Sequence, residues 1–197
     1  MLLRIRTRLS TRTARWRGVK VVRRFVRQED GATAVEFGIV AAPFLALVFA
    51  ILETAIIFFA GQTLETAVSD SSRLIMTGQA QAQNLTQSSF KDKVCAKIYG
   101  LFDCANGMSV DVRTYTSFST ATTAKPVDSN GNFIDNFTYS PGGPGQIVVV
   151  RLMYQWPVYV SLLGFNLADI AGGKRLLMAT AVFRNEPFTA ATPPSGT

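Results

Sequence analysis

The chain has 197 residues, which leaves room for one domain, or for one domain plus a membrane anchor. Its net charge is +7, but half of its 20 Lys and Arg residues lie between Arg4 and Arg27, so the excess belongs to one N-terminal block. Without a recognition motif or interleaved aromatic residues, this block predicts no nucleic-acid partner. The chain contains no histidine and no recognisable phosphate-binding loop, so we expect no catalytic residues, no cofactor and no enzyme.

An apolar segment from Phe37 to Phe59 follows the basic block, and Glu53 is its one charged residue. As a helix, these 23 residues would be about 35 Å long, slightly more than a hydrocarbon core of about 30 Å. We therefore predict a transmembrane helix over residues 32–61, surrounded by membrane lipid. Glu53 should lie near the outer interface, where snorkelling accounts for it; a contact with a partner is the alternative.

The distribution of charge predicts how this helix is oriented. Segments rich in Lys and Arg beside a membrane span stay in the cytoplasm. Residues 1–31 are therefore predicted to be a basic cytoplasmic leader, and residues 62–197 an extracytoplasmic domain. This arrangement describes a single-pass protein of the inner membrane.

The junction between leader and span reads Gly31-Ala-Thr-Ala-Val-Glu36-Phe37. Gly31 lacks a side chain, so a protease could hold an extended backbone closely at this point. The alternative is that Gly31 only precedes a helix, with Thr33 as its N-cap and Glu36 as the capping-box partner. The residues alone do not separate these two interpretations.

The junction resembles the cleavage site of type IV-like prepilins and, more closely, the TadE-like pseudopilins of the tight-adherence (Flp) pilus system. The resemblance is strongest over Gly31–Arg73, and two C-terminal segments also look similar to that family: Tyr154–Pro157 and Ala179–Pro187.

The resemblance implies that a prepilin peptidase cuts between Gly31 and Ala32. It also implies that Glu36 and Phe37 set assembly and register against other pilins and pseudopilins. Glu36 would then pair with the new amine of Ala32; the alternative is a solvated interfacial carboxylate.

After the span, the helix is predicted to continue as an amphipathic extension, from about Thr33 to Thr77 in all, and to stop at Gly78. Residues at helical spacing form its apolar side: Leu64, Ala67, Val68, Ser71 and Ile75. Residues 79–90 are rich in Gln, Ser and Asn, and we predict that they form a connection between the long helix and the next element.

A second, short helix is predicted over Ser88–Leu101, with Phe90, Val94 and Ile98 at four-residue spacing. Cys95 and Cys104 are the only cysteines. In a domain outside the cytoplasm they favour one disulfide, with two buried free thiols as the alternative. Metal binding is not expected, because there is no histidine and the cysteine spacing does not suit zinc.

Three strands are predicted in the remainder, over Met108–Arg113, Gln146–Trp156 and Leu176–Arg184. A long polar loop at 119–145 separates the first two strands. Residues 158–170 are apolar but irregular and suggest a surface-lying or partner-facing loop, and the tail after Pro187 is expected to be mobile. The predicted fold class is α+β: a long N-terminal transmembrane helix that continues into a pilin-like domain with a small antiparallel sheet.

We therefore expect a minor pilin-like subunit of a tight-adherence pilus or a related secretion machine. The alternative from the sequence is an uncleaved single-pass membrane protein whose outer domain binds a ligand or signals.

Overall fold

The computed structural model describes residues 29–98, 100–160 and 166–189. Most of the predicted leader, part of the predicted loop at 158–170 and most of the predicted tail after Pro187 lie outside these residues. The chain divides into two units, Met1–Val48 and Phe49–Thr197, and each is described by itself.

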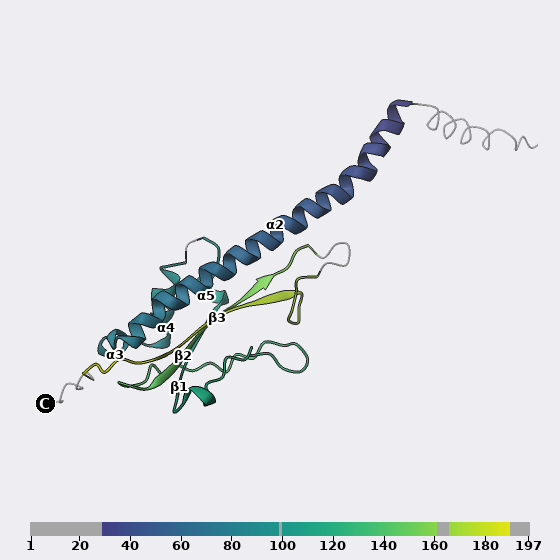
Figure 1. Ribbon diagram of the computed structural model, residues 1–197. Helices are drawn as coiled ribbons and strands as arrows, with labels where there is room; N and C mark the ends of the chain where they lie inside the picture. The colour runs from purple at the N-terminus through teal and green to yellow at the C-terminus, as the bar shows by residue number, and fades with distance from the viewer. Residues whose placement is uncertain (1–28, 99, 161–165, 190–197) are drawn as a thin grey trace, which may run out of the picture. The chain divides into compact units, whose positions relative to one another are not determined.

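Helix α2 spans Glu29–Met76 and contributes residues to both units (Figure 1). Its first residue lies before the predicted start, so Thr33 lies inside the helix and the N-cap interpretation of Thr33 is wrong. Gly31 also lies within α2. A glycine inside a helix costs about 1 kcal/mol relative to alanine, which does not interrupt a helix that continues through a long apolar segment.

In the second unit, α2 buries one side from Glu53 onward, and this buried stripe follows the predicted helical spacing. The buried members include the predicted Leu64, Ala67, Val68, Ser71 and Ile75, preceded by Ile57 and Ala60. The helix ends at Met76. Gly78 then adopts a left-handed backbone with φ of 77°, which glycine takes without steric cost, and its N–H donates to the carbonyl of Ile75. The predicted stop is confirmed.

Three short helices follow α2, and they differ in part from the predicted elements. Helix α3 (Gln79–Ala82) lies in the predicted connection, and α5 (Cys104–Gly107) precedes the first strand. Helix α4 spans Gln87–Cys95 and ends well before the predicted Leu101. Its start is fixed by a capping box, in which the side chains of Thr86 and Ser89 each accept the other residue's backbone N–H.

The sheet has three antiparallel strands in the order β1-β2-β3. Their bounds are Met108–Tyr115 for β1, Ile147–Pro157 for β2 and Lys174–Arg184 for β3. The three predicted strands are therefore confirmed with shifted ends, and Pro157 is the last residue of β2, as expected. The register sets Asp111 of β1 opposite Arg151 of β2, and Arg151 opposite Thr180 of β3.

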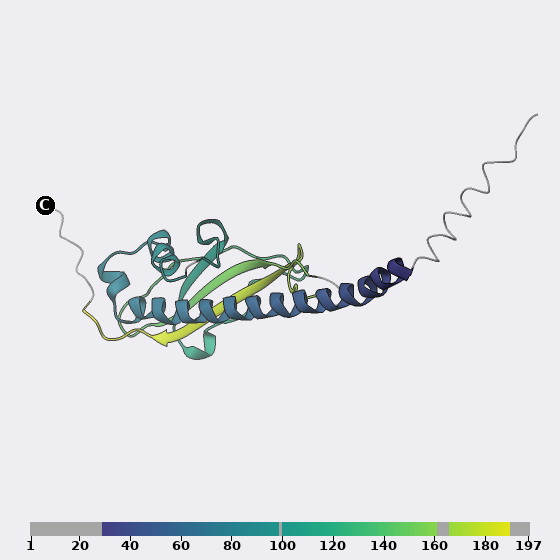
Figure 2. The same ribbon diagram turned by 90° about the horizontal axis from the view of Figure 1, so that it is seen from above.

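One face of the sheet packs against the stripe of α2 and against α4, and Figure 2 shows the second part of α2 lying along the strands. Alternate residues of each strand form this core, as their apolar alternation predicts. The sheet contributes Met108, Val110, Val112, Val148, Val150, Leu152, Leu177 and Ala179. A long helix on a small antiparallel sheet confirms the α+β class.

The opposite face of the sheet carries a second, smaller core around Met153, Ile170 and Leu176. Side chains from the segment between β1 and β2 cover it, and these are Val127, Phe133 and Phe137. The prediction of a polar loop at 119–145 is therefore incomplete, because apolar residues spaced along this loop bury themselves against the sheet.

Candidate functional site

The predicted processing and assembly residues all lie in the first part of α2. Gly31 has free space around it, because an added Cβ would meet nothing within 4 Å, and Ala32 follows it within the helix. Glu36 is exposed, and the ring of Phe37 is 73% exposed. The cut after Gly31 and the register role of Glu36 and Phe37 stay predictions.

The surface of α2 around Glu36 is apolar as well as exposed. No residue from Thr33 to Val48 with a described side chain is buried. The helix has a mean hydropathy of 2.4 in its most apolar window, and none of that window is buried. Its large exposed side chains include Ile39, Val40, Phe44, Leu45 and Leu47. By length and composition, α2 could cross a membrane, which would remove these side chains from water.

Glu53 is the second acidic residue in this apolar part of α2, and its surroundings differ from the prediction. Only 9% of it is exposed. One carboxylate oxygen accepts the backbone N–H of Tyr159 at 2.6 Å, and the other accepts the N–H of Val160 at 3.0 Å. The snorkelling interpretation is therefore wrong: Glu53 binds the segment that follows β2 within the same chain.

A buried ion pair joins the sheet to the loop on its second face. Asp111 of β1 and Arg151 of β2 are both buried, and their side chains meet at 2.6 Å. Arg113 also donates to Asp111, at 3.0 Å. The loop provides the remaining partners, because the N–H of Thr138 donates to Asp111 and Arg151 donates to the carbonyl of Ala124.

The pKa of Asp111 reflects these contacts. Burial alone would raise the pKa of this carboxyl group. The N–H of Thr138, the hydrogen bonds from Arg151 and Arg113, and the charge of Arg151 outweigh burial and hold the pKa below its usual value. Asp111 is therefore a charged structural residue that fixes the loop over the sheet.

The predicted disulfide between Cys95 and Cys104 is confirmed, with the two Cα atoms 5.8 Å apart. It ties the last residue of α4 to the first residue of α5, directly before β1. The alternative of two free thiols is excluded. The bridge closes a short loop next to the core residues Ile98 and Phe102.

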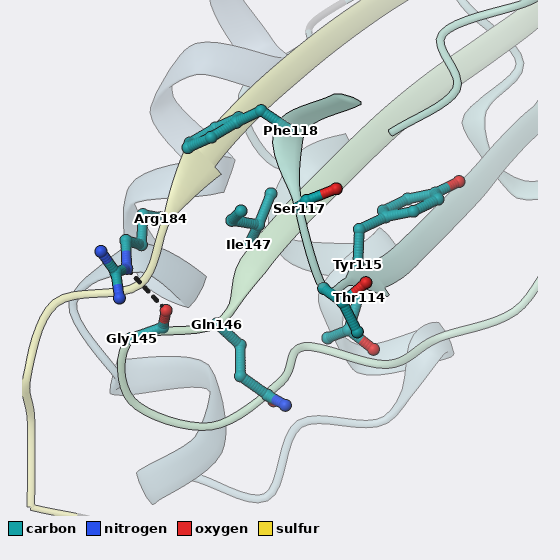
Figure 3. A pocket seen from close by; sticks show the side chains of 9 residues that line it. Thr114, Tyr115, Ser117, Phe118, Gly145, Gln146, Ile147 and Arg184 are labelled. Atoms are coloured by element: carbon teal, nitrogen blue, oxygen red, sulfur yellow. Dashed lines mark hydrogen bonds between the residues drawn. The ribbon is translucent and has the colours of Figure 1, made fainter. Parts of the chain in front are cut away.

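Two open hollows border the sheet. The first, of about 580 Å³, lies where the strands meet the β1–β2 loop, and Tyr115, Phe118 and Ile147 are among the residues that line it. At its side, Arg184 donates a hydrogen bond to the carbonyl of Gly145 (Figure 3). The second, of about 710 Å³, runs between α2 and β3 and carries Glu65 and Arg73. Within the described residues, no three His, Cys, Asp or Glu side chains gather to form a metal site.

Sequence reasoning missed the partners of Glu53 and the buried pair of Asp111 and Arg151. One signal for the pair was present, since Arg151 interrupts an otherwise apolar strand and Asp111 lies on the facing strand. A similar signal existed for Glu53, because it begins the helical spacing that continues through Ile57 and Leu64.

The comparisons with known proteins agree with this geometry. A family model described as TadE-like protein matches residues 31–73. The matched segment begins at Gly31, contains the whole exposed apolar part of α2 and ends within the buried stripe, so the resemblance stated over Gly31–Arg73 is confirmed there. The curated proteins give no match, and neither do the solved structures.

Proposed function

We propose that this chain is a minor pilin-like subunit for assembly of a tight-adherence pilus or a related secretion machine. The proposal starts from the TadE-like segment, which indicates a relation to the Tad pilus. The observation that carries the proposal is that the family match coincides with α2, the one helix among the described residues that is long and apolar enough to cross a membrane. The helix would anchor the subunit in the inner membrane.

The proposed orientation places the basic leader in the cytoplasm and the sheet domain outside it. Ten basic residues before the apolar segment support this orientation, because such segments resist translocation. The disulfide between Cys95 and Cys104 gives independent support, since structural disulfides persist in oxidising compartments and are rare in the cytoplasm.

Processing by a prepilin peptidase would release the leader after Gly31. The new amine of Ala32 would then lie about one helical turn from Glu36, in its own chain or a neighbouring one. The exposure of Glu36 supports this role, because its carboxylate has room for a partner from another pilin. Opposite charges near a membrane interface attract more strongly than in bulk water, and desolvation offsets part of this gain.

Other pilins and pseudopilins would bind through the exposed apolar side chains of α2. Small residues at Gly38, Ala41 and Ala42 permit a close approach of helices. The domain beyond the membrane would remain available to further components of the pilus machine.

A deletion strain tests the function, and the mature N-terminus tests the processing. We expect cells without this protein to lose surface pili in electron micrographs, and plasmid-borne wild type to restore them.

Mass spectrometry of the purified protein should give a chain that begins at Ala32. Gly31→Leu should leave the longer precursor, because a bulky side chain does not fit where glycine is cut, while Gly38→Leu serves as the control. Normal piliation of the deletion strain would remove the pilus role. Retention of residues 1–31 beside an active peptidase would favour an uncleaved single-pass protein.

A further inference from the structure

Glu53 is the first residue of α2 that the second unit buries. Before it, no residue from Thr33 to Leu52 with a described side chain is buried, and after it the buried stripe continues through Ile57, Ala60 and Leu64. The chain therefore changes at Glu53 from a helix without buried side chains among those described to a helix that packs on its own domain.

The carboxylate of Glu53 needs no water at this position. Each of its two oxygens accepts one backbone N–H, from Tyr159 and from Val160. Such charge-assisted bonds are shorter and about twice as strong as neutral ones. They hold the start of the β2–β3 connection against α2 and satisfy a charge that would otherwise be costly near hydrocarbon.

The side of α2 that faces away from the domain stays apolar past Glu53. Phe58 is 71% exposed, and Ile56 and Phe59 are exposed beside it. Tyr159, held next to Glu53 through its backbone, is 81% exposed. Aromatic side chains at this level are typical of the interface between a membrane and water, where Tyr and Trp form belts.

We propose that the lipid-spanning part of α2 ends at Glu53 rather than at Gly61, and that Phe58, Phe59 and Tyr159 lie in the outer lipid interface. This inference rests on the proposed function only in taking α2 as a membrane anchor. Phe37 to Leu52 gives about 24 Å of helix, somewhat less than the hydrocarbon core. Glu53 then lies at the edge of the hydrocarbon, and Phe58 and Phe59, about 8 and 9 Å further along, lie at the outer boundary of a headgroup layer about 5–8 Å thick.

The lipid surface is the occupant that the observations favour. The exposed aromatic residues are continuous with the exposed apolar surface of the span itself. The opposite side of the same helical turns is already covered by protein, because Ile57 and Ala60 belong to the core. The domain would therefore rest on the membrane with one side of α2 and the Tyr159 segment in contact with lipid.

Spin labels on single cysteines can measure this depth in the full chain, reconstituted into vesicles of phosphatidylethanolamine and phosphatidylglycerol. The native cysteines do not interfere, since both are in the disulfide. The variants are Phe58→Cys and Tyr159→Cys, with Leu45→Cys as the reference for the span and Ser119→Cys as the exposed control. The readout compares the accessibility of each label to oxygen, which enters lipid, with its accessibility to a water-soluble nickel chelate.

We expect oxygen to dominate at position 45 and nickel to dominate at position 119, with an intermediate ratio of the two at positions 58 and 159. Glu53→Ala should shift the label at position 159 to nickel, because its backbone anchor is lost, and leave the label at position 58 unchanged. Glu65→Ala, which removes an exposed acid of the same helix, should change neither.

Two results would overturn the inference. Nickel access at positions 58 and 159 as high as at position 119 would place them in water. Shielding from both reagents would show that another subunit, not lipid, covers them. A label at position 45 that nickel reaches would instead contradict the membrane anchor, and with it the proposed function.

Discussion

Glu36 and Glu53 are two carboxylates on the same apolar helix with opposite surroundings. Glu36 is exposed. Glu53 is almost fully buried and accepts two backbone N–H groups of its own chain. The two acids of this helix therefore differ. Glu36 is open to a partner from outside the chain, whereas groups of the chain itself satisfy Glu53.

The difference separates a residue proposed to act in assembly, Glu36, from one that the fold itself uses, Glu53. In the first unit, no residue from Thr33 to Val48 with a described side chain is buried, and the proposed function assigns this surface to lipid and neighbouring subunits. The helix from Glu53 onward supplies one side of the core, so its sequence is fixed by packing against β1, β2 and β3. This distinction predicts how substitutions act on stability and on assembly.

The largest effect on stability is expected at Asp111. Like Glu53, this carboxylate is buried and satisfied by groups of its own chain. Asp111→Asn leaves the buried Arg151 without its charge partner and should destabilise the chain by about 4 kcal/mol. Urea unfolding of the full chain in detergent micelles, followed by tryptophan fluorescence, measures this change. Glu65→Gln is a matched control that should have little effect, since Glu65 is exposed.

The pH dependence gives a second readout of Asp111. Its pKa is lowered in the folded state, so its contribution is present above the usual value of 3.8 and is lost as the pH falls through the folded pKa. The wild type should lose stability steeply below about pH 4, and Asp111→Asn should lose less over the same range. Equal slopes for the two proteins would contradict this role of Asp111.

Glu53→Ala is expected to come next, at about 3 kcal/mol, because two N–H groups in a partly buried segment lose a charged acceptor. The same unfolding measurement applies, and Glu36→Ala is the paired variant. If both substitutions destabilise the chain equally, the contrast between the two carboxylates is wrong.

Tyr139 is the opposite case to these satisfied carboxylates, because its buried polar group lacks a partner among the described residues. Its hydroxyl is buried without a hydrogen bond among the described residues, and its ring packs on Phe90 at 5.6 Å. Tyr139→Phe should be neutral or stabilising by up to about 1 kcal/mol. Burial raises the pKa of Tyr139 to about 12, so the wild type alone should lose stability as the pH rises above about 10. A clear destabilisation at neutral pH would show that the hydroxyl has a partner.

The smallest effect on stability is expected at Glu36. Glu36→Gln should change the free energy of unfolding by less than about 0.5 kcal/mol, as is usual for exposed positions. Cleavage should also remain, while the number of pili per cell falls, because glutamine cannot pair with an amine as a charge does. Normal pilus numbers would exclude the charge-pairing role even if processing is confirmed.

The elements that depend on local pattern could be predicted from the sequence. The stripe of α2, the stop at Gly78 and the three strands follow from periodicity over a few residues, and the disulfide follows from having two cysteines. The end of α4 could not be predicted, because Ile98 keeps the apolar spacing and stays buried after the helix has ended.

The buried polar contacts depend on register between distant segments, which the sequence does not display. Asp111 and Arg151 are 40 residues apart, and Glu53 and Tyr159 are 106 residues apart. For the same reason, strand alternation places Asp111 on the side away from the main core but does not reveal that the loop covers that side.

The position of β3 after β2 in the chain has a consequence for the proposed export. A chain that leaves the cytoplasm after its anchor delivers α4 and the cysteines early, and the disulfide can close once Cys104 has emerged. The sheet cannot be completed until the final strand arrives, because β3 pairs with β2 and the N–H of Glu186 then closes onto the carbonyl of Met76. Until that moment the strand edge of β2 is bare. On the proposed export route, the chain therefore passes through an anchored and oxidised state in which the edge of β2 that later pairs with β3 is still open.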